Sequence, residues 1–261
     1  MSQIKLFVAT HKKYSMPADE GYVPIHVGKE GKEDLGFLGD DTGEHISGKN
    51  ANYCELTALY WIWKNASSDV VGLCHYRRYF SEVIDRPTKK EDPFSHILHT
   101  DDVNFLLEAY DVILPKKRDY YIESVWSHYK HAHHIQDLAA AKGILMRDYP
   151  EYVDSFNKVM NGRKLHLYNM FIMKKELFNE YAQWLFAILK KLEEEIHIEQ
   201  YSPYQARVFG FISERLFNVW IHHHQLQIKM LGIVSIEKEN KLKKYISFLS
   251  RKIRGNSIEA N

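Results

Sequence analysis

The chain alternates between short, mostly apolar runs and longer stretches with the spacing of amphipathic helices. The runs that have the length and composition of buried strands are Ile4–Ala9, Val70–Cys74, Asp111–Pro115 and Leu167–Met173. Because such runs alternate with helical stretches, we predict an α/β fold in which a mostly parallel sheet is flanked by helices on both faces.

The helical stretches are recognised by apolar residues at three- and four-residue spacing. The longest places Phe178, Tyr181, Leu185, Ile188 and Leu192 on one face. Further helices are predicted at Tyr53–Lys64, Asp101–Ala109, Glu123–Lys142, Asp148–Val159 and around Phe211–Phe217. Asn52 and Glu55 have the spacing of a capping box, which would place Glu55 in the first turn of its helix.

Residues 1–237 are predicted to form one domain, and residues 238–261 a basic amphipathic helix or tail. Seven Lys and Arg residues lie between Lys238 and Arg254 beside apolar residues at helical spacing. Such a helix can lie in the interface of an anionic membrane. The alternative is that its apolar face packs on the domain while its charges face water.

Composition excludes several classes of partner and location. The net charge of +1 gives no chain-wide field that would attract nucleic acid. The apolar runs Ala58–Trp63 and Trp184–Leu189 are far shorter than the ~20 residues of a membrane-spanning helix. Cys54 and Cys74 have no metal-ligand spacing and fit a reducing compartment. We therefore expect a cytoplasmic protein, in contact with the inner face of the plasma membrane at most.

Cationic clusters follow the ends of three predicted strands. Thr10, His11 and Lys12 follow the first strand, the segment His75-Tyr76-Arg77-Arg78 follows the second, and Lys116-Lys117-Arg118 follows the third. Open α/β sheets bind ligands beyond the carboxyl ends of their strands, so these clusters indicate a site for an anion. Two neighbouring guanidiniums can clamp a diphosphate. The alternatives are solvated turns, and arginines paired with nearby carboxylates.

Carboxylates and histidines supply the remaining candidates. Glu214 lies in an apolar stretch, where it can act as a general base or form a structural pair with Arg215. His131, His134 and Asp137 have helical spacing and predict a polar pocket wall that touches acceptor or phosphate. A zinc site is disfavoured there, because the segment has no H-E-x-x-H arrangement and no cysteine.

Two weaker features complete the candidates. Asp40-Asp41 stands in a glycine-rich segment and predicts either a turn or a contact with a metal or sugar. The sequence contains no G-x-S-x-G, P-loop, G-x-G-x-x-G or C-x-x-C motif, so hydrolase, NTPase, dehydrogenase and thiol-redox activities lack support.

Several segments, in order, resemble a bacterial family catalogued as domain of unknown function 4422, which occurs in capsule and lipopolysaccharide gene clusters. The segments that carry the resemblance are Gly21–Gly28, Asn52–Thr57, His75–Phe80, Asp111–Arg118, Tyr168–Met173 and Gly210–Leu216. The resemblance implies a GT-A-like, Rossmann-type fold. It also implies glycosyl transfer from a UDP-sugar, with galactose or galactofuranose favoured, to a capsular or cell-surface polysaccharide acceptor.

On this hypothesis Thr10, His11 and Lys12 bind the uridine end of the donor, and His75, Tyr76, Arg77 and Arg78 its diphosphate. By resemblance Asn169 contacts sugar, and His131, His134 and Asp137 line the acceptor side. Glu214 is the leading base, which implies inversion at the anomeric carbon.

The metal requirement is set by the end of the second strand. GT-A enzymes carry an Asp-x-Asp metal motif there, and this chain has His75-Tyr76-Arg77 instead. Fixed cations can neutralise a leaving diphosphate, so neither Mn²⁺ nor Mg²⁺ is favoured as a cofactor. The acceptor is expected to be lipid-linked or an oligosaccharide. The competing hypotheses are a non-catalytic module that binds anionic polysaccharide, and a nucleotide-sugar hydrolase.

Overall fold

The computed structural model describes residues 2–81, 92 and 94–236. The predicted basic tail at 238–261 lies outside the described residues, as do residues 82–91 and 93. Within the part that is described, no helix has the length and apolarity needed to cross a bilayer.

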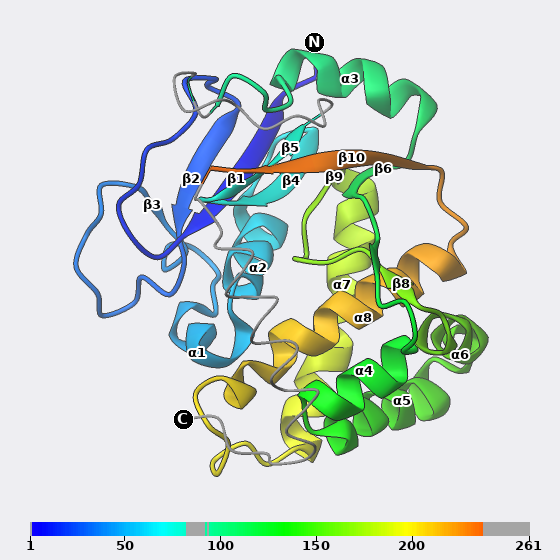
Figure 1. Cartoon of the computed structure of the whole chain (residues 1–261). Helices are drawn as coiled ribbons and strands as arrows, with labels where there is room; N and C mark the ends of the chain where they lie inside the picture. The colour runs from blue at the N-terminus through cyan, green and yellow to red at the C-terminus, as the bar shows by residue number, and fades with distance from the viewer. Residues whose placement is uncertain (1, 82–91, 93, 237–261) are drawn as a thin grey trace.

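A single large sheet forms the centre of the fold (Figure 1). Its strands are β1 (Ile4–Thr10), β2 (Tyr22–His26), β3 (Leu38–Gly39), β4 (Val70–His75), β5 (Arg78–Ser81), β6 (Val112–Pro115), β9 (Phe171–Lys174) and β10 (Ile228–Ser235). They are ordered β3-β2-β1-β4-β5-β10-β6-β9, and β9 also pairs with β4. A separate two-stranded ribbon pairs β7 (Arg118–Asp119) with β8 (Lys164–Leu165).

The α/β class is confirmed, but the sheet is mixed where a mostly parallel one was expected. The strands β3, β2, β1 and β4 are parallel to one another, as are β6 and β10. The strands β5 and β9 run the opposite way and pair antiparallel with their neighbours. Together these pairings close a ring through β4, β5, β10, β6 and β9. The antiparallel β5 arises because the chain turns back immediately after His75, so that Arg78 begins a new strand.

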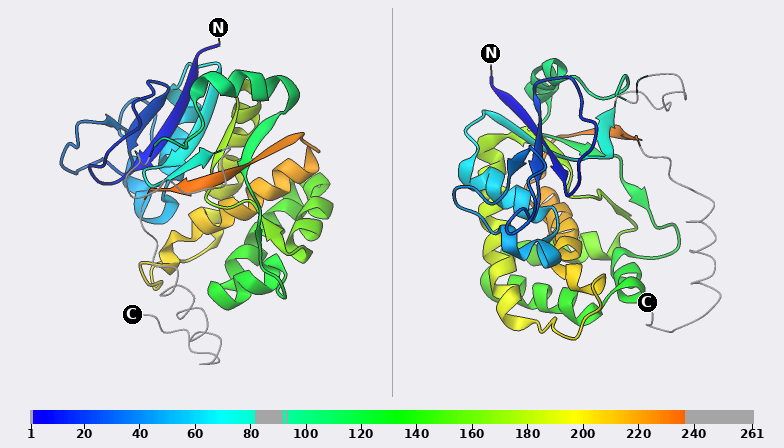
Figure 2. Two further views of the ribbon diagram at one scale, coloured as in Figure 1. Left: turned by 45° about the horizontal axis from the view of Figure 1, so that its top comes forward. Right: turned by 90° about the vertical axis from the view of Figure 1, so that its left-hand side faces the viewer.

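Helices cover both faces of the sheet (Figures 1 and 2). The helix α3 (Thr100–Ala109) packs on one face, against β1 and β6. The helices α2 (Leu56–Asn65) and α7 (Lys175–Glu195) pack on the other, with α8 (Val208–His223) against α7. The remaining helices are α1 (Asn50–Tyr53), α4 (Val125–Ala132), α5 (Ile135–Asp148), α6 (Val153–Asn161) and the short 3-10 turns Ser47–Lys49, Pro150–Tyr152 and Gln205–Arg207.

Alternation along the central strands divides the core into two layers. Phe7 of β1 and Leu73 of β4 belong to the core beneath α2, α7 and α8, while their neighbours Val8 and Cys74 belong to the core beneath α3. Successive side chains of a strand point to opposite faces, so apolar runs without alternation are what a sheet covered on both sides requires. The predicted apolar face of the long helix is confirmed, since all five of its residues are buried.

Two predicted helices are broken in the structure. Tyr53–Lys64 divides into α1 and α2 at Cys54, whose φ of 55° ends the first helix. Glu55 is the residue before α2 and makes no side-chain cap, while Asn52 Nδ2 donates to the carbonyl of Ala206 at 2.9 Å. The predicted capping box is therefore wrong. Glu123–Lys142 likewise divides into α4 and α5 at His133, whose backbone is extended.

Gly72 is tightly enclosed in the core, where β4 runs between β1 and β9. A Cβ atom there would lie 2.7 Å from Leu6 Cδ2, 2.9 Å from Ile172 Cγ1 and 3.0 Å from the Phe171 carbonyl oxygen. We expect Gly72→Ala to lower the free energy of unfolding by about 1–3 kcal/mol through overpacking, as measured by urea denaturation.

The matched control is Gly143→Ala in α5, where an added Cβ meets nothing within 4 Å. That substitution should raise the stability by about 0.5–1 kcal/mol, since alanine favours a helix interior over glycine. Equal effects of the two substitutions would contradict the packing argument.

Candidate functional site

The loop that follows β1 is shaped by Thr10. Its side chain is fully buried, and its hydroxyl donates to the Lys12 carbonyl at 2.6 Å. The Lys12 N–H donates to the Thr10 hydroxyl oxygen at 3.3 Å. The β1 end lies beside the β4 end, because Ala9 pairs with His75. Thr10 therefore turns His11 and Lys12 outward at the edge where β4 also ends.

Tyr76 is the centre of a cluster that joins these two strand ends. The rings of His11 and Tyr14 meet its ring edge-on at centroid distances of 5.4 and 5.2 Å. The cations of Lys12 and Arg77 lie 4.9 and 5.5 Å from its ring centroid. Burial, then the charges of Lys12 and Arg77, lower the pKa of His11. The structure thus brings together Thr10, His11, Lys12, Tyr76 and Arg77, as the sequence predicted.

His75 and Arg78 flank the turn between β4 and β5, and both contact Tyr168. The Arg78 guanidinium lies 4.6 Å from the Tyr168 ring centroid. His75 Nε2 donates to the Tyr168 carbonyl at 2.7 Å, and burial lowers the pKa of this histidine despite the nearby Glu55 charge. Neutral His75 thus carries its proton on Nε2, where the carbonyl holds it.

Tyr168 and Asn169 form a left-handed turn that places several polar groups. Their φ angles are 76° and 51°. The Tyr168 N–H donates to Glu214 Oε1 at 2.7 Å. Asn169 is 2% exposed; its Nδ2 donates to Glu55 Oε1 at 2.7 Å, and its Oδ1 accepts from the Ser213 hydroxyl at 3.0 Å. Asn169 is therefore buried and positions Glu55, and its predicted contact with sugar stays a prediction.

Glu214 projects from α8 into this cluster. Its Oε2 accepts from Arg215 Nη1 at 3.0 Å, and its side chain is 17% exposed. Burial raises the pKa of Glu214, against the lowering effects of Arg215 and the Tyr168 N–H. The structure thus contains the predicted pair of Glu214 with Arg215. The role of Glu214 as a general base stays a prediction.

Glu55 is the carboxylate that sequence reasoning missed, because a capping role explained it. It lies close enough to His75 and Glu214 to shift the pKa of both. It follows Cys54, a non-glycine residue in a sparsely populated backbone region, and such strain is concentrated at functional sites. Arg207 Nε donates to Cys54 Sγ at 3.1 Å on the neighbouring turn. The broken helix, which the sequence pattern does not show, brings Glu55 to the site.

The predicted wall of His131, His134 and Asp137 does not form. His131 ends α4 and pairs with Glu123 at 2.7 Å, with its side chain 63% exposed. His134 stacks on Tyr201 at 4.2 Å, and Asp137 accepts from the Tyr201 hydroxyl at 2.9 Å. His134 and Asp137 thus share Tyr201, but His131 is separated from them because α4 and α5 are separate helices and helical spacing does not apply across His133.

Other residues of the same segment face the site side of α8. His133 stacks on Phe211 at 4.1 Å, and His128 lies 4.0 Å from the ring of Tyr120. Burial, and after it the charge of Arg215, lower the pKa of His128 to about 4. His128 and His133 thus belong to the surroundings of the site in place of His131 and His134.

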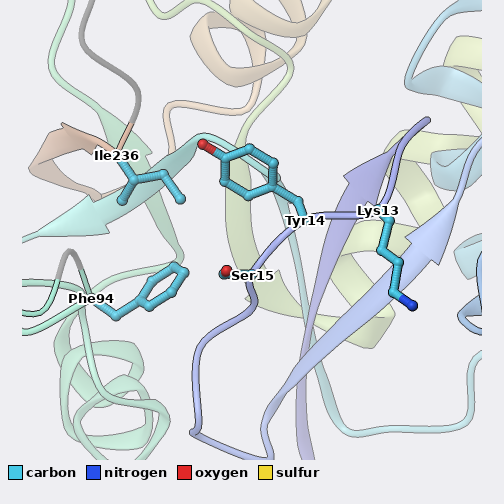
Figure 3. Close-up of a pocket in the computed structure, with 5 residues that line it drawn as sticks. All are labelled: Lys13, Tyr14, Ser15, Phe94 and Ile236. Carbon is cyan, nitrogen blue, oxygen red and sulfur yellow. The ribbon is translucent and has the colours of Figure 1, made fainter.

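A hollow of about 530 Å³ borders the Tyr76 cluster (Figure 3). Lys13, Tyr14, Ser15, Phe94 and Ile236 line it, and the side chains of Tyr14, Phe94 and Ile236 point toward one another. It lies next to the loop after β1 and does not include the carboxylates Glu55 and Glu214.

Asp40 is explained by the backbone around it. Its carboxylate accepts from the N–H groups of Gly28 and Lys29 at 2.7 and 3.1 Å and from the Ser47 hydroxyl at 2.5 Å. It therefore holds the loop after β2, as the turn interpretation predicted. Among the described residues, no group of three or more His, Cys, Asp or Glu side chains is arranged to hold a metal ion.

Comparison with known proteins connects this site to a family. The model of the domain of unknown function DUF4422 matches residues 5–225, which includes every candidate described above. The chain belongs to this family. No curated protein matches it.

A solved structure also resembles this member of DUF4422. It is the apo structure of the bifunctional glycosyltransferase WbbM, with a TM-score of 0.82 and 33% identity. The match covers 91% of this chain and 46% of that one, so the chain spans about half the length of WbbM. The fold is thus that of part of a glycosyltransferase.

Proposed function

We propose that this DUF4422 protein is a glycosyltransferase that moves a hexose from a UDP-sugar to a hydroxyl of a capsular or other cell-surface polysaccharide. The likeness to WbbM over nearly the whole chain supports the reaction class. The family resemblance favours galactose or galactofuranose as the sugar, and a lipid-linked or oligosaccharide acceptor. A GT-A-like arrangement is part of the proposal, with the parallel strands β3-β2-β1-β4 as its nucleotide-binding half.

One observation carries the proposal: cations and buried carboxylates meet at the same edge of the sheet. Lys12, Arg77 and Arg78 surround the turn between β4 and β5, while Glu55 and Glu214 lie just beyond Tyr168. The cations suit the diphosphate of a nucleotide sugar, and the Tyr76 cluster offers aromatic surface to the uracil ring of the donor. Transfer needs cations that stabilise the anionic leaving group and a general base that takes the acceptor proton. This edge of the sheet has residues suited to both tasks.

The chemical step then needs no covalent intermediate. Glu214 removes the proton of the acceptor hydroxyl as that oxygen attacks the anomeric carbon. The bond from this carbon to the diphosphate oxygen breaks, and UDP leaves with the electron pair. A single displacement of this kind inverts the anomeric configuration. The arginines stabilise the negative charge that develops on the leaving diphosphate.

We expect UDP to stabilise the protein in a thermal-shift assay, and Arg77→Ala or Arg78→Ala to remove most of that stabilisation. A charge-assisted contact contributes about 1.5–3 kcal/mol, which corresponds to roughly 10- to 100-fold in affinity. Arg147→Ala is the control, because Arg147 pairs with Glu195 on the surface of α5. Wild-type UDP affinity in folded Arg77→Ala and Arg78→Ala variants would remove the clamp from the proposal.

We propose that the reaction is independent of a divalent metal, because His75, Tyr76 and Arg77 occupy the place of an Asp-x-Asp motif. Activity should therefore survive EDTA, measured as UDP release from UDP-galactose. Complete loss of activity, restored by Mn²⁺, would contradict this.

The two carboxylates are distinguished by Glu214→Gln and Glu55→Gln. If Glu214 is the base, its substitution should lower kcat by about 100-fold or more while UDP stabilisation is retained. Glu55→Gln keeps an oxygen that can accept from Asn169 Nδ2, so its kcat should fall by less than about tenfold. The reverse order of effects would transfer the role of base to Glu55.

A further inference from the structure

Three aromatic side chains, one exposed and two half-buried, form a group beside the carboxylates. The ring of His133 stacks on Phe211 and on Tyr204, at centroid distances of 4.1 and 5.9 Å. Tyr204 and Phe211 lie 5.3 Å apart. Tyr204 is 54% exposed, so this aromatic platform (His133, Tyr204 and Phe211) offers ring surface to solvent.

The platform is fixed in place by hydrogen bonds at its base. Gln205 Oε1 lies 3.0 Å from His133 Nδ1, and Gln205 Nε2 donates to the Ala132 carbonyl at 3.0 Å. These contacts join the end of α4 to the turn that precedes α8. The rings are thus held before any ligand arrives, which reduces the entropy lost on binding.

Arg207 connects the platform to the carboxylates. Its guanidinium lies 5.8 Å from the Phe211 ring centroid, and its Nε donates to Cys54 Sγ, next to Glu55. Burial raises the pKa of Glu214, and the Arg207 charge is among the groups that oppose this shift. A ligand that extends from the two carboxylates over Arg207 therefore reaches the rings.

We propose that this platform is the subsite for the acceptor glycan: a neutral hexose stacks on Tyr204, and the next sugar presents its hydroxyl to Glu214 and Glu55. The proposal rests on the function proposed above and adds the residues that hold the acceptor. A hexose has an apolar C–H face for the ring and hydroxyls for Arg207, which matches sites where aromatic surface is combined with a few polar groups.

Arg207 lies beside the platform, but three cations gather at the β4–β5 turn, which is therefore the better place for the diphosphate of a nucleotide. Burial lowers the pKa of His133 to about 4, so the ring is uncharged at neutral pH. The cations of the β4–β5 turn lie on the other side of Tyr168, where the diphosphate is expected. Donor and acceptor would thus approach the carboxylates from opposite sides.

The test uses the full-length protein with lactose, maltose and cellobiose as probes, each with and without UDP. Saturation-transfer NMR should show transfer to the C–H protons of at least one disaccharide. Tyr204→Ala should weaken that binding by roughly tenfold, and Tyr204→Phe, which keeps the ring, should restore it. The UDP thermal shift should be unchanged in both variants.

Phe105→Ala is the matched control, because Phe105 is 75% exposed on α3, across the sheet from the platform. The proposal is overturned if the wild type binds none of the three disaccharides, or if Tyr204→Ala binds as the wild type does. It is also overturned if Tyr204→Ala abolishes the UDP thermal shift, because the uracil of UDP would then be the group that stacks on Tyr204. Sugar binding that depends on Tyr204 without any UDP shift in the wild type would instead refute the proposed transferase and leave the subsite standing.

Discussion

The Tyr168–Asn169 turn holds the site together. Its backbone and side chains contact β4 through His75, α8 through Glu214 and Ser213, and the α1–α2 break through Glu55. These partners come from three separate parts of the chain, so no local pattern could assemble them. Two successive residues with positive φ cost free energy, which the hydrogen bonds to Glu214 and Glu55 offset.

The turn also separates two kinds of chemistry. The ring of Tyr168 faces Arg78, while its N–H faces Glu214. Lys12, Arg77 and Arg78 are gathered on the side of β1 and β5. The carboxylates lie on the side of α8, where Arg207 and Arg215 accompany them. A nucleotide sugar needs both, with its diphosphate near the cations and its anomeric carbon near a base. The position of one residue therefore sets the polarity along which a donor would lie.

Local patterns predicted the parts of this molecule that local physics decides. The strands around Phe7 and Leu73 and the apolar face of α7 follow from side-chain periodicity, and the strand-end clusters at His11 and Arg77 follow from the direction of parallel strands. The basic tail stays a prediction.

Breaks in periodicity were beyond these patterns. The left-handed Cys54 and the extended His133 each divide a helix that looks continuous in the sequence. Both errors displaced site residues: Glu55 was assigned to a cap, and His131 and His134 to a common face. Tertiary contacts such as Asn52 with Ala206 decide these breaks, and they join residues far apart in sequence.

Burial of Glu214 lowers the stability of the folded protein at neutral pH. Because burial raises its pKa, ionisation of the folded protein is less favourable than that of the unfolded chain. The folded state therefore loses stability as the pH rises from the unfolded value through the raised folded value, and the loss persists at neutral pH. The Tyr168 N–H and Arg215 limit this loss by favouring the charged form. If Glu214 served only as a structural partner of Arg215, complete shielding of the pair from water would strengthen their attraction. Glu214 keeps 17% of its side chain open to solvent, and on the proposed function the acceptor hydroxyl would reach the carboxylate through this opening.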